Sequence, residues 1–194
     1  MCIRDSAQGI YDSYTDLYYF TDATQIQVFS RTQGKWLAPI PITPPPGTTE
    51  RLWGIALSPD GSMMAVADAG AGAIYLLNPA NPMSVQTFPM TGVNAGTLPC
   101  GIAVSDSGMV YFTTVGQGIG GADQFFKLNT TTGQITNYGI QGPDYNGNAY
   151  LRTVISSDNS EVFFNDDGLV FSIDAATDTP FFALDGYGLS LIHI

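Results

Sequence analysis

Residues 54–79 read GIALSPDGSMMAVADAGAGAIYLLNP, and this stretch decides the fold. It holds three short apolar runs, each bounded by glycine, proline, serine or aspartate. Proline followed by aspartate and glycine at 59–61 is the chemistry of a tight turn. Short apolar runs separated by such turns predict β-strands, and the window shows no helical period. The stretch therefore predicts three consecutive antiparallel strands, and a fourth follows at 84–88.

The same order of strands and turns recurs along the chain. Aligning Gly54 with Gly101 and Thr153 gives copies offset by 47 and 52 residues, with the third tight turn at Ser157–Ser160 and a partial copy from Leu17. Repeats of roughly 40–50 residues with four short strands are typical of β-propeller blades. We therefore predict an all-β fold, a β-propeller fragment of four-stranded antiparallel blades, about three complete and one partial. The blades are expected at about 7–46, 47–92, 93–142 and 143–188.

The first and last six residues read MCIRDS and LSLIHI. Their amino-acid sequences are unrelated, but their coding sequences can be reverse complements of one another. The codons ATG TGT ATA AGA GAC AG encode the first, and their reverse complement encodes the second. The shared string is similar to a transposon-end adapter of sequencing libraries. We therefore expect residues 1–6 and 189–194 to be adapter-derived and to pack poorly, and residues 7–188 to be the natural stretch. A genuine N-terminus and a genuine C-terminal strand are the alternative.

Composition and charge exclude several classes of protein. The chain has 17 acidic and 6 basic residues, a formal charge of −11, whereas nucleic-acid binding needs clustered lysine and arginine. No apolar run approaches the roughly 18 residues of a membrane helix, so no membrane span is expected in the fragment. Hydrophobic residues make up 44 % of the chain, which is enough to build a packed core. Residues 7–188 contain one cysteine, Cys100, and no histidine.

The stretch quoted first resembles the repeats of NHL- and YVTN-type β-propellers, in which a Gly-Ile-Ala-Val strand meets a Pro-Asp-Gly turn. GIAVSDSGMVYFTT (101–114) and DATQIQVFSRTQGKW (22–36) resemble the same units. Such repeats imply a propeller and are shared by many functions. The resemblance extends loosely to streptogramin B lyases, which rely on histidine, and to gluconolactonase-type lactonases. The lactonase type implies a Ca²⁺ site of Glu, Asn and Asp, and Glu50 and Glu161 are the only glutamates here.

The connections between strands differ in length on the two faces of the propeller. With the strands of a blade labelled a to d from the channel outward, the a–b and c–d turns share one face, the short-turn face. The b–c and d–a connections share the other, and they are longer and more varied. Loops on a rigid scaffold are the usual place for binding, so we predict a binding site on this loop-rich face. Its candidate residues are Trp53, Asp68, Asp123, Tyr145, Asp166 and Asp167.

The aspartates among these candidates are expected to make the channel mouth acidic, which favours a basic partner, a polar glycan or a divalent cation. No cofactor is predicted, and Ca²⁺ is an open alternative because convergent Asp side chains and loop carbonyls are its ligands. The short turns at Pro59–Gly61 and Thr131–Gly133 are expected to be dispensable for binding. Random sequence change in surface loops that have no function would produce the same difference in loop length between the two faces.

Two classes of function follow. The first is a non-enzymatic binding propeller, extracellular, periplasmic or on the cell surface, whose loop-rich face contacts a protein or a glycan and no nucleic acid. The second is a propeller enzyme of lyase or lactonase type, with catalytic residues mostly outside this fragment. We favour the first class, because neither enzyme pattern carries over to residues of this sequence.

Overall fold

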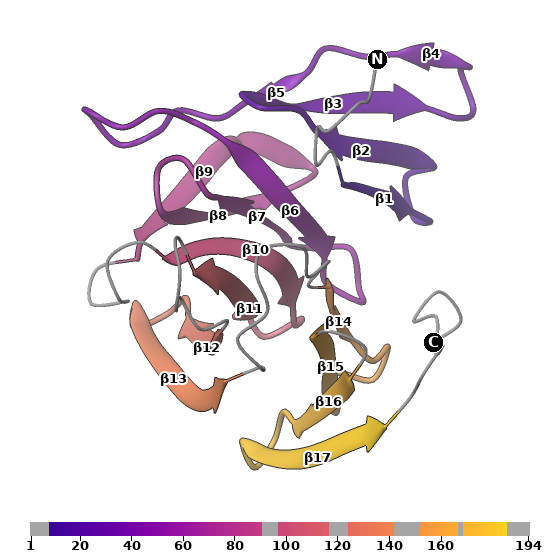
Figure 1. Cartoon of the computed structure of the whole chain (residues 1–194). Helices are drawn as coiled ribbons and strands as arrows, with labels where there is room; N and C mark the ends of the chain where they lie inside the picture. Colours follow the sequence, from indigo (N-terminus) through magenta and orange to yellow (C-terminus); the bar gives the residue numbers. More distant parts are fainter. Residues whose placement is uncertain (1–7, 91–96, 117–123, 142–151, 167–168, 186–194) are drawn as a thin grey trace.

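The computed structural model of the chain describes residues 8–90, 97–116, 124–141, 152–166 and 169–185. Within these ranges, seventeen strands form four antiparallel sheets (Figure 1). The expected all-β propeller of four-stranded antiparallel blades is confirmed. The described part holds no helix long and apolar enough to cross a lipid bilayer. Both terminal hexapeptides lie outside the described residues, so their adapter origin stays a prediction.

Each sheet is one blade, with its strands hydrogen-bonded in chain order. Blade 1 consists of β1 (Gly9–Asp12), β2 (Leu17–Thr21), β3 (Gln25–Ser30), β4 (Lys35–Trp36) and β5 (Ile40–Pro41). Blade 2 consists of β6 (Leu52–Leu57), β7 (Met64–Asp68), β8 (Ala73–Asn78) and β9 (Asn81–Pro89). Blade 3 consists of β10 (Thr97–Val104), β11 (Met109–Gly116), β12 (Gln124–Asn129) and β13 (Gln134–Gln141). Blade 4 consists of β14 (Arg152–Ile155), β15 (Glu161–Asp166), β16 (Leu169–Asp174) and β17 (Thr179–Asp185).

Blade 1 is fuller than the partial copy expected from the sequence. Its innermost strand, β1, pairs along its whole length with β2, although GIYD lacks the longer apolar run of the other inner strands. Its outer strand is split, because β4 and β5 both pair with β3 and cover two residues each. Pro39 and Pro41 lie in this segment, and proline cannot donate to a ladder. Blade 1 therefore fills all four strand positions, with a broken outer edge.

The tight turns between strands a and b fix the register of the repeats. In each turn the fourth residue donates its N–H to the carbonyl of the first: Gly61 to Ser58, Gly108 to Ser105, and Asn159 to Ser156. The third turn is thus Ser156–Asn159, and the expected turn at Ser157–Ser160 is wrong by one residue. The fourth position is left-handed in all three turns, with φ of 72°, 79° and 61°. Asparagine adopts this conformation more readily than serine.

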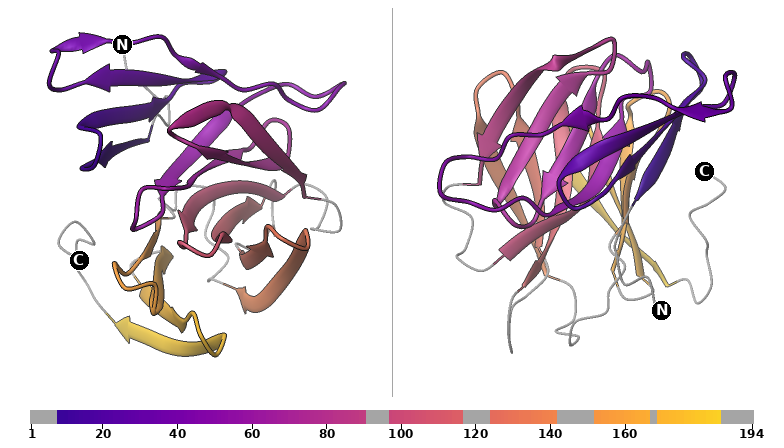
Figure 2. Two further views of the ribbon diagram at one scale, coloured as in Figure 1. Left: turned by 180° about the vertical axis from the view of Figure 1, so that it is seen from behind. Right: turned by 90° about the horizontal axis from the view of Figure 1, so that it is seen from above.

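Three hydrophobic clusters hold neighbouring blades together. The seams are Tyr19, Ile26 and Val28 against Met64, Val66 and Tyr75 (blades 1 and 2), Ala65 and Ile74 against Phe112 and Phe126 (blades 2 and 3), and Tyr111 and Phe125 against Phe164 and Phe171 (blades 3 and 4). Among the described residues no such cluster joins blade 4 to blade 1. The described blades therefore form an open arc, which the left view of Figure 2 shows from behind.

Candidate binding site

The structure describes two of the six predicted site residues in full, Trp53 and Asp68. Asp123, Tyr145 and Asp167 lie outside the described residues, and Asp166 is placed only as the last residue of β15.

The described part of the loop-rich face gathers three connections around the start of β6. These are residues 22–24, 42–51 and 69–72. Leu52 donates its N–H to the carbonyl of Ala23 at 3.1 Å, and Ala69 donates to the carbonyl of Arg51 at 3.0 Å. Backbone hydrogen bonds thus join loops of blades 1 and 2 into one surface.

Asp68 anchors two of these connections. Its Oδ1 accepts the backbone N–H groups of Arg51 and Gly70 at 2.8 Å and of Ala71 at 2.9 Å. Its Oδ2 accepts the Tyr75 hydroxyl at 3.0 Å. The side chain is 0 % exposed, and burial together with this carboxylate raises the pKa of Tyr75 above its ordinary value. The geometry gives Asp68 a structural role beneath the face, and its predicted contact with a ligand stays a prediction.

Trp53 and Arg51 form an aromatic–cation pair at the loop-rich end of β6. The Arg51 guanidinium carbon lies 5.4 Å from the Trp53 ring centroid, within the range of a cation–π contact. Trp53 is half-buried, and its carbonyl accepts the hydroxyl of Thr21, in blade 1, at 2.8 Å. Arg51 is exposed. The pair therefore combines a half-buried aromatic ring with an accessible positive charge.

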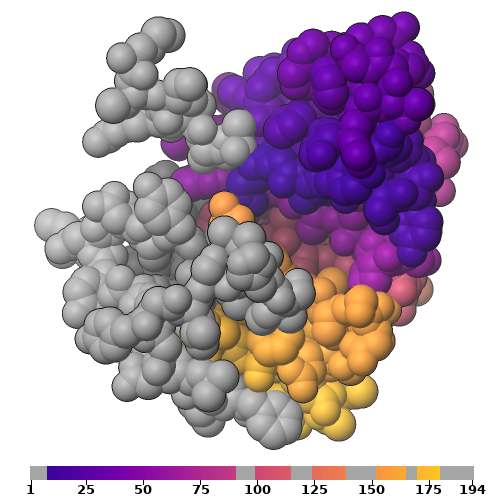
Figure 3. All heavy atoms as spheres, turned by 90° about the vertical axis from the view of Figure 1, so that its right-hand side faces the viewer, coloured from indigo at the N-terminus to yellow at the C-terminus, as the bar shows by residue number. Residues whose placement is uncertain are grey.

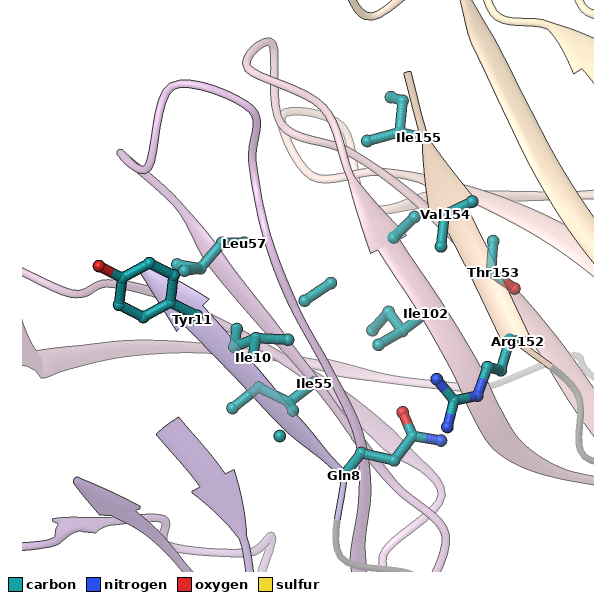
Figure 4. A pocket seen from close by; sticks show the side chains of 13 residues that line it. Gln8, Ile10, Tyr11, Ile55, Leu57, Ile102, Arg152, Thr153, Val154 and Ile155 are labelled. Atoms are coloured by element: carbon teal, nitrogen blue, oxygen red, sulfur yellow. The ribbon is translucent and has the colours of Figure 1, made fainter. Parts of the chain in front are cut away.

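The inner strands of the four blades line a cavity of about 580 Å³ (Figure 4). Its lining combines polar groups with aliphatic side chains, among them Ile10, Ile55, Ile102 and Val154 from four different blades. Gln8 and Arg152 lie where β1 and β14 begin, at the loop-rich end, and Figure 4 shows their side chains pointing toward one another. The channel is thus lined by aliphatic side chains and polar groups together, and Gln8 and Arg152 lie at its mouth on the predicted binding face.

Positive residues on the loop-rich face are the part of the site that sequence reasoning missed. Arg51 and Arg152 are single basic residues in unrelated stretches, and neither forms a motif. Only the fold brings them to one face, through the starts of β6 and β14. The one signal that could have identified them is their position, just before or at the start of an inner strand.

The short-turn face carries both signs of charge with acidic residues in excess, since Arg31 and Lys35 lie in and beside the c–d turn of blade 1. The a–b and c–d turns and the strand ends beside them carry Asp12, Asp16, Asp60, Asp106, Asp158, Asp174 and Asp178. The described part of the loop-rich face carries Asp22, Glu50 and the buried Asp68, and Asp166 and Asp185 end β15 and β17 on the same side, beside two arginines. The expected acidic mouth therefore depends on Asp123, Asp166 and Asp167, and it stays a prediction.

The a–b turns contact one another from blade to blade. The Tyr14 hydroxyl donates to the Pro59 carbonyl at 3.2 Å, and the Asp60 N–H donates to Asp106 Oδ1 at 2.9 Å. The Asp106 N–H donates to Asn159 Oδ1 at 2.9 Å, and Asn159 Nδ2 donates to Asp106 Oδ2 at 2.6 Å. These turns link all four blades, a role that their short sequences did not indicate. Whether they are dispensable for binding is a separate question and stays a prediction.

Within the described ranges, no three His, Cys, Asp or Glu side chains come together as metal ligands. The candidate Ca²⁺ ligands include Asp123 and Asp167, which lie outside the described residues, so the Ca²⁺ alternative also stays a prediction. Cys100 is buried, with its Sγ 3.5 Å from the carbonyl oxygen of Thr113. This environment suits a thiol that packs in the core.

Comparison with known proteins places the chain in a fold class. No protein-family model matches it, and no curated protein sequence matches it. Solved structures that match include hydrazine synthase of Kuenenia stuttgartiensis, at 14 % identity and a TM-score of 0.60, over 87 % of this chain and 46 % of that chain. The WD40 repeats of RRP9 match at 15 % and 0.64, over 92 % and 51 %. A luciferin-regenerating enzyme matches at 14 % and 0.64, over 93 % and 60 %.

These likenesses define a β-propeller with WD40-type and other propeller neighbours. At such identities they show the fold alone. The chain spans about half the length of the solved structures that it matches. The NHL or YVTN type within this class stays a prediction.

Proposed function

We propose that the chain is a non-enzymatic binding propeller that works outside the cytoplasm and contacts a partner protein through its loop-rich face. The observation that carries the proposal is the Arg51–Trp53 pair, with 5.4 Å between the guanidinium carbon and the ring centroid. Tryptophan and arginine are enriched among the interface residues that contribute most to protein binding. The likeness to a WD40 propeller supports a scaffold of this kind.

The loops that carry the pair are held in place before any partner arrives. Asp68 accepts three backbone N–H groups from them, and Thr21 fixes the backbone of Trp53 from the neighbouring blade. A surface that is already ordered loses little conformational entropy on binding. This preorganisation supports a binding role for the face.

The charge of the mouth adds a requirement for the partner. Arg51 and Arg152 lie on the loop-rich side together with Asp22 and Glu50, and more of the described aspartates lie on the opposite face. A partner segment with hydrogen-bond acceptors beside an aromatic or aliphatic side chain fits both the pair and the channel wall.

The proposal is tested with the chain as bait in three forms, wild type, Arg51→Ala and Thr131→Ala. Thr131 is exposed in the c–d turn of blade 3, on the short-turn face, so it is the matched control. A partner protein is expected to bind wild type and Thr131→Ala alike. Arg51→Ala is expected to weaken binding by about 2 kcal/mol, roughly 30-fold, as measured by calorimetry.

Three outcomes would contradict parts of the proposal. Loss of binding in Thr131→Ala alone would move the site to the short-turn face. A glycan array run on the same three proteins distinguishes a glycan partner from a protein partner. A glycan signal that Arg51→Ala abolishes would support the loop-rich face as the binding site and would contradict the proposed protein partner. The location is tested by fractionating source cells, and recovery in the cytoplasm would refute it.

A further inference from the structure

The connection between β5 and β6, residues 42–51, carries the longest run of prolines in the chain. Pro44, Pro45 and Pro46 are consecutive. Figure 1 shows this connection extending outward from blades 1 and 2. It extends away from the side that the space-filling view of Figure 3 shows, where blade 1 (indigo) and blade 4 (orange to yellow) face the viewer. The connection is thus a projecting part of the loop-rich face.

Covalent geometry restricts the backbone of this run. The proline ring holds φ at about −65°, and a residue that precedes proline is restricted to extended conformations. Thr43, Pro44 and Pro45 each precede a proline, so all three are extended. Such a run forms a polyproline II helix, which has about three residues per turn. Thr43 and Pro46 then share one edge of the helix, and both are exposed, while Pro44 and Pro45 are half-buried.

Both limbs of the connection are anchored in the protein. On the outgoing limb, Ile40 and Ile42 are buried in the hydrophobic cluster between blades 1 and 2. The returning limb packs closely on Gly70. A Cβ atom at Gly70 would lie 2.2 Å from the Thr49 carbonyl oxygen and 2.8 Å from the Arg51 backbone nitrogen, so only glycine permits this approach. The proline run is therefore held at the surface between two fixed ends.

A tight turn closes the tip of the connection. Thr48 donates its N–H to the Pro45 carbonyl at 3.1 Å, and its hydroxyl donates to the same oxygen at 2.6 Å. Gly47 has a φ of 84°, which the third position of a type II turn requires, and Pro46 occupies the second position, where proline is favoured. The tip is therefore ordered before a partner arrives, which lowers the entropic cost of binding.

We propose that residues 43–46, the proline ridge, insert into an aromatic-lined groove of the partner protein. Proline has no backbone N–H, so the ridge offers ring faces and carbonyl oxygens rather than a strand edge. Grooves lined with aromatic side chains recognise polyproline II segments of this kind, because the helix is formed before binding. This assignment rests on the proposed function, since it names the chemistry of the partner that contacts the loop-rich face.

The test is calorimetry of the chain with purified SH3, WW and EVH1 domains, which have aromatic-lined grooves. Wild type is expected to bind at least one of them. Pro44→Ala/Pro46→Ala is expected to weaken that binding about tenfold, because it removes two rings and frees the segment before binding. The matched control is Pro79→Ala/Pro89→Ala, since Pro79 is half-buried and Pro89 is exposed, as Pro44 and Pro46 are. The control should bind as wild type does, and all three proteins should give the same circular dichroism spectrum.

Competition with an oligoproline peptide tests the mode of binding. Oligoproline should displace wild type from the domain, whereas a glycine–serine peptide of equal length should not. Failure of every domain to bind wild type would overturn the assignment, and so would unchanged binding by Pro44→Ala/Pro46→Ala.

The Arg51→Ala variant distinguishes failure of this assignment from failure of the proposed function. The same variants are measured with the partner captured by the wild-type bait. Binding that Arg51→Ala weakens and Pro44→Ala/Pro46→Ala leaves unchanged would support the Arg51–Trp53 pair and overturn the proline ridge. The reverse result would support the proline ridge and contradict the role of the pair.

Discussion

At the scale of single residues, the loop-rich face depends on a carboxylate that no partner can reach. Asp68 is buried and accepts three backbone N–H groups and one hydroxyl. Burying a carboxylate destabilises a protein unless the carboxylate accepts hydrogen bonds. Buried N–H groups that lose such an acceptor also lower the free energy of unfolding. Asp68 therefore acts on the binding face by holding Arg51 and the turn that follows β7.

Replacing this anchor is expected to destabilise the fold. Asp68→Ala leaves the N–H groups of Arg51, Gly70 and Ala71 without their acceptor, and a loss of about 3 kcal/mol in the free energy of unfolding is expected. Urea unfolding followed by tryptophan fluorescence measures it. The control is Asp22→Ala, in an exposed turn of blade 1, with an expected loss below about 1 kcal/mol. Equal losses in the two variants would contradict the anchoring role.

Residue chemistry could be predicted from the sequence only where it follows a pattern. Trp53 was found because it lies at the start of an inner strand beside a long loop. Arg51 was missed, because its contact with Trp53 gives no sequence signal beyond adjacency. The sequence predicts Asp68 on the loop-rich face, where the structure places it. Its burial could not be predicted, because it depends on contacts with Tyr75 and with the loop 42–51 that leads from blade 1 to blade 2.

At the scale of elements, the a–b turns are closed by aspartates whose charge the fold favours. The Ser58 hydroxyl, with smaller contributions from Ser62, lowers the pKa of Asp60 to about 2. The Ser156 and Ser160 hydroxyls lower the pKa of Asp158 to about 2. Because these pKa values are below their ordinary value, the turns contribute stability that is complete at neutral pH. That contribution is lost as the pH falls through about 2.

Acid is therefore expected to weaken the turns. The melting temperature of wild type should fall between about pH 4 and pH 2, since the carboxylates must then be protonated in the folded state. Asp158→Asn keeps a hydrogen-bond acceptor and removes the titration, so its melting temperature should fall less over the same range. Thermal unfolding followed by circular dichroism measures both. Parallel pH curves for the two proteins would contradict this account.

Most elements could be predicted from the sequence, and the exceptions have physical causes. The expected strands AIYLLN and QFFKLN coincide with β8 and β12. An apolar run between two turns determines where its strand begins and ends. The strand β1 was missed because its four residues, GIYD, form no such run and are held by pairing with β2. The third turn was misplaced because Ser156 and Ser157 are adjacent and equivalent in type, and only the backbone of Asn159 distinguishes them.

At the scale of the whole molecule, the arc has two faces of different character. Short turns that contact one another link the blades on the acidic side. The opposite side presents the Arg51–Trp53 pair and the mouth of the channel. Under the proposed function, this asymmetry is expected to orient an approaching partner, since the summed charge of a protein steers association. We therefore expect one face to contribute stability and the other to carry recognition.

Hydrogen–deuterium exchange with and without a captured partner tests this assignment most directly. Binding at the loop-rich face should slow exchange of the backbone amides in residues 49–53 and 69–72, and at Arg152 where β14 begins. The amides of the short turns at 58–62 and 105–109 should exchange at the same rate in both states, because they are bonded to one another before binding. Slower exchange confined to those short turns, with residues 49–53 unchanged, would contradict the central claim.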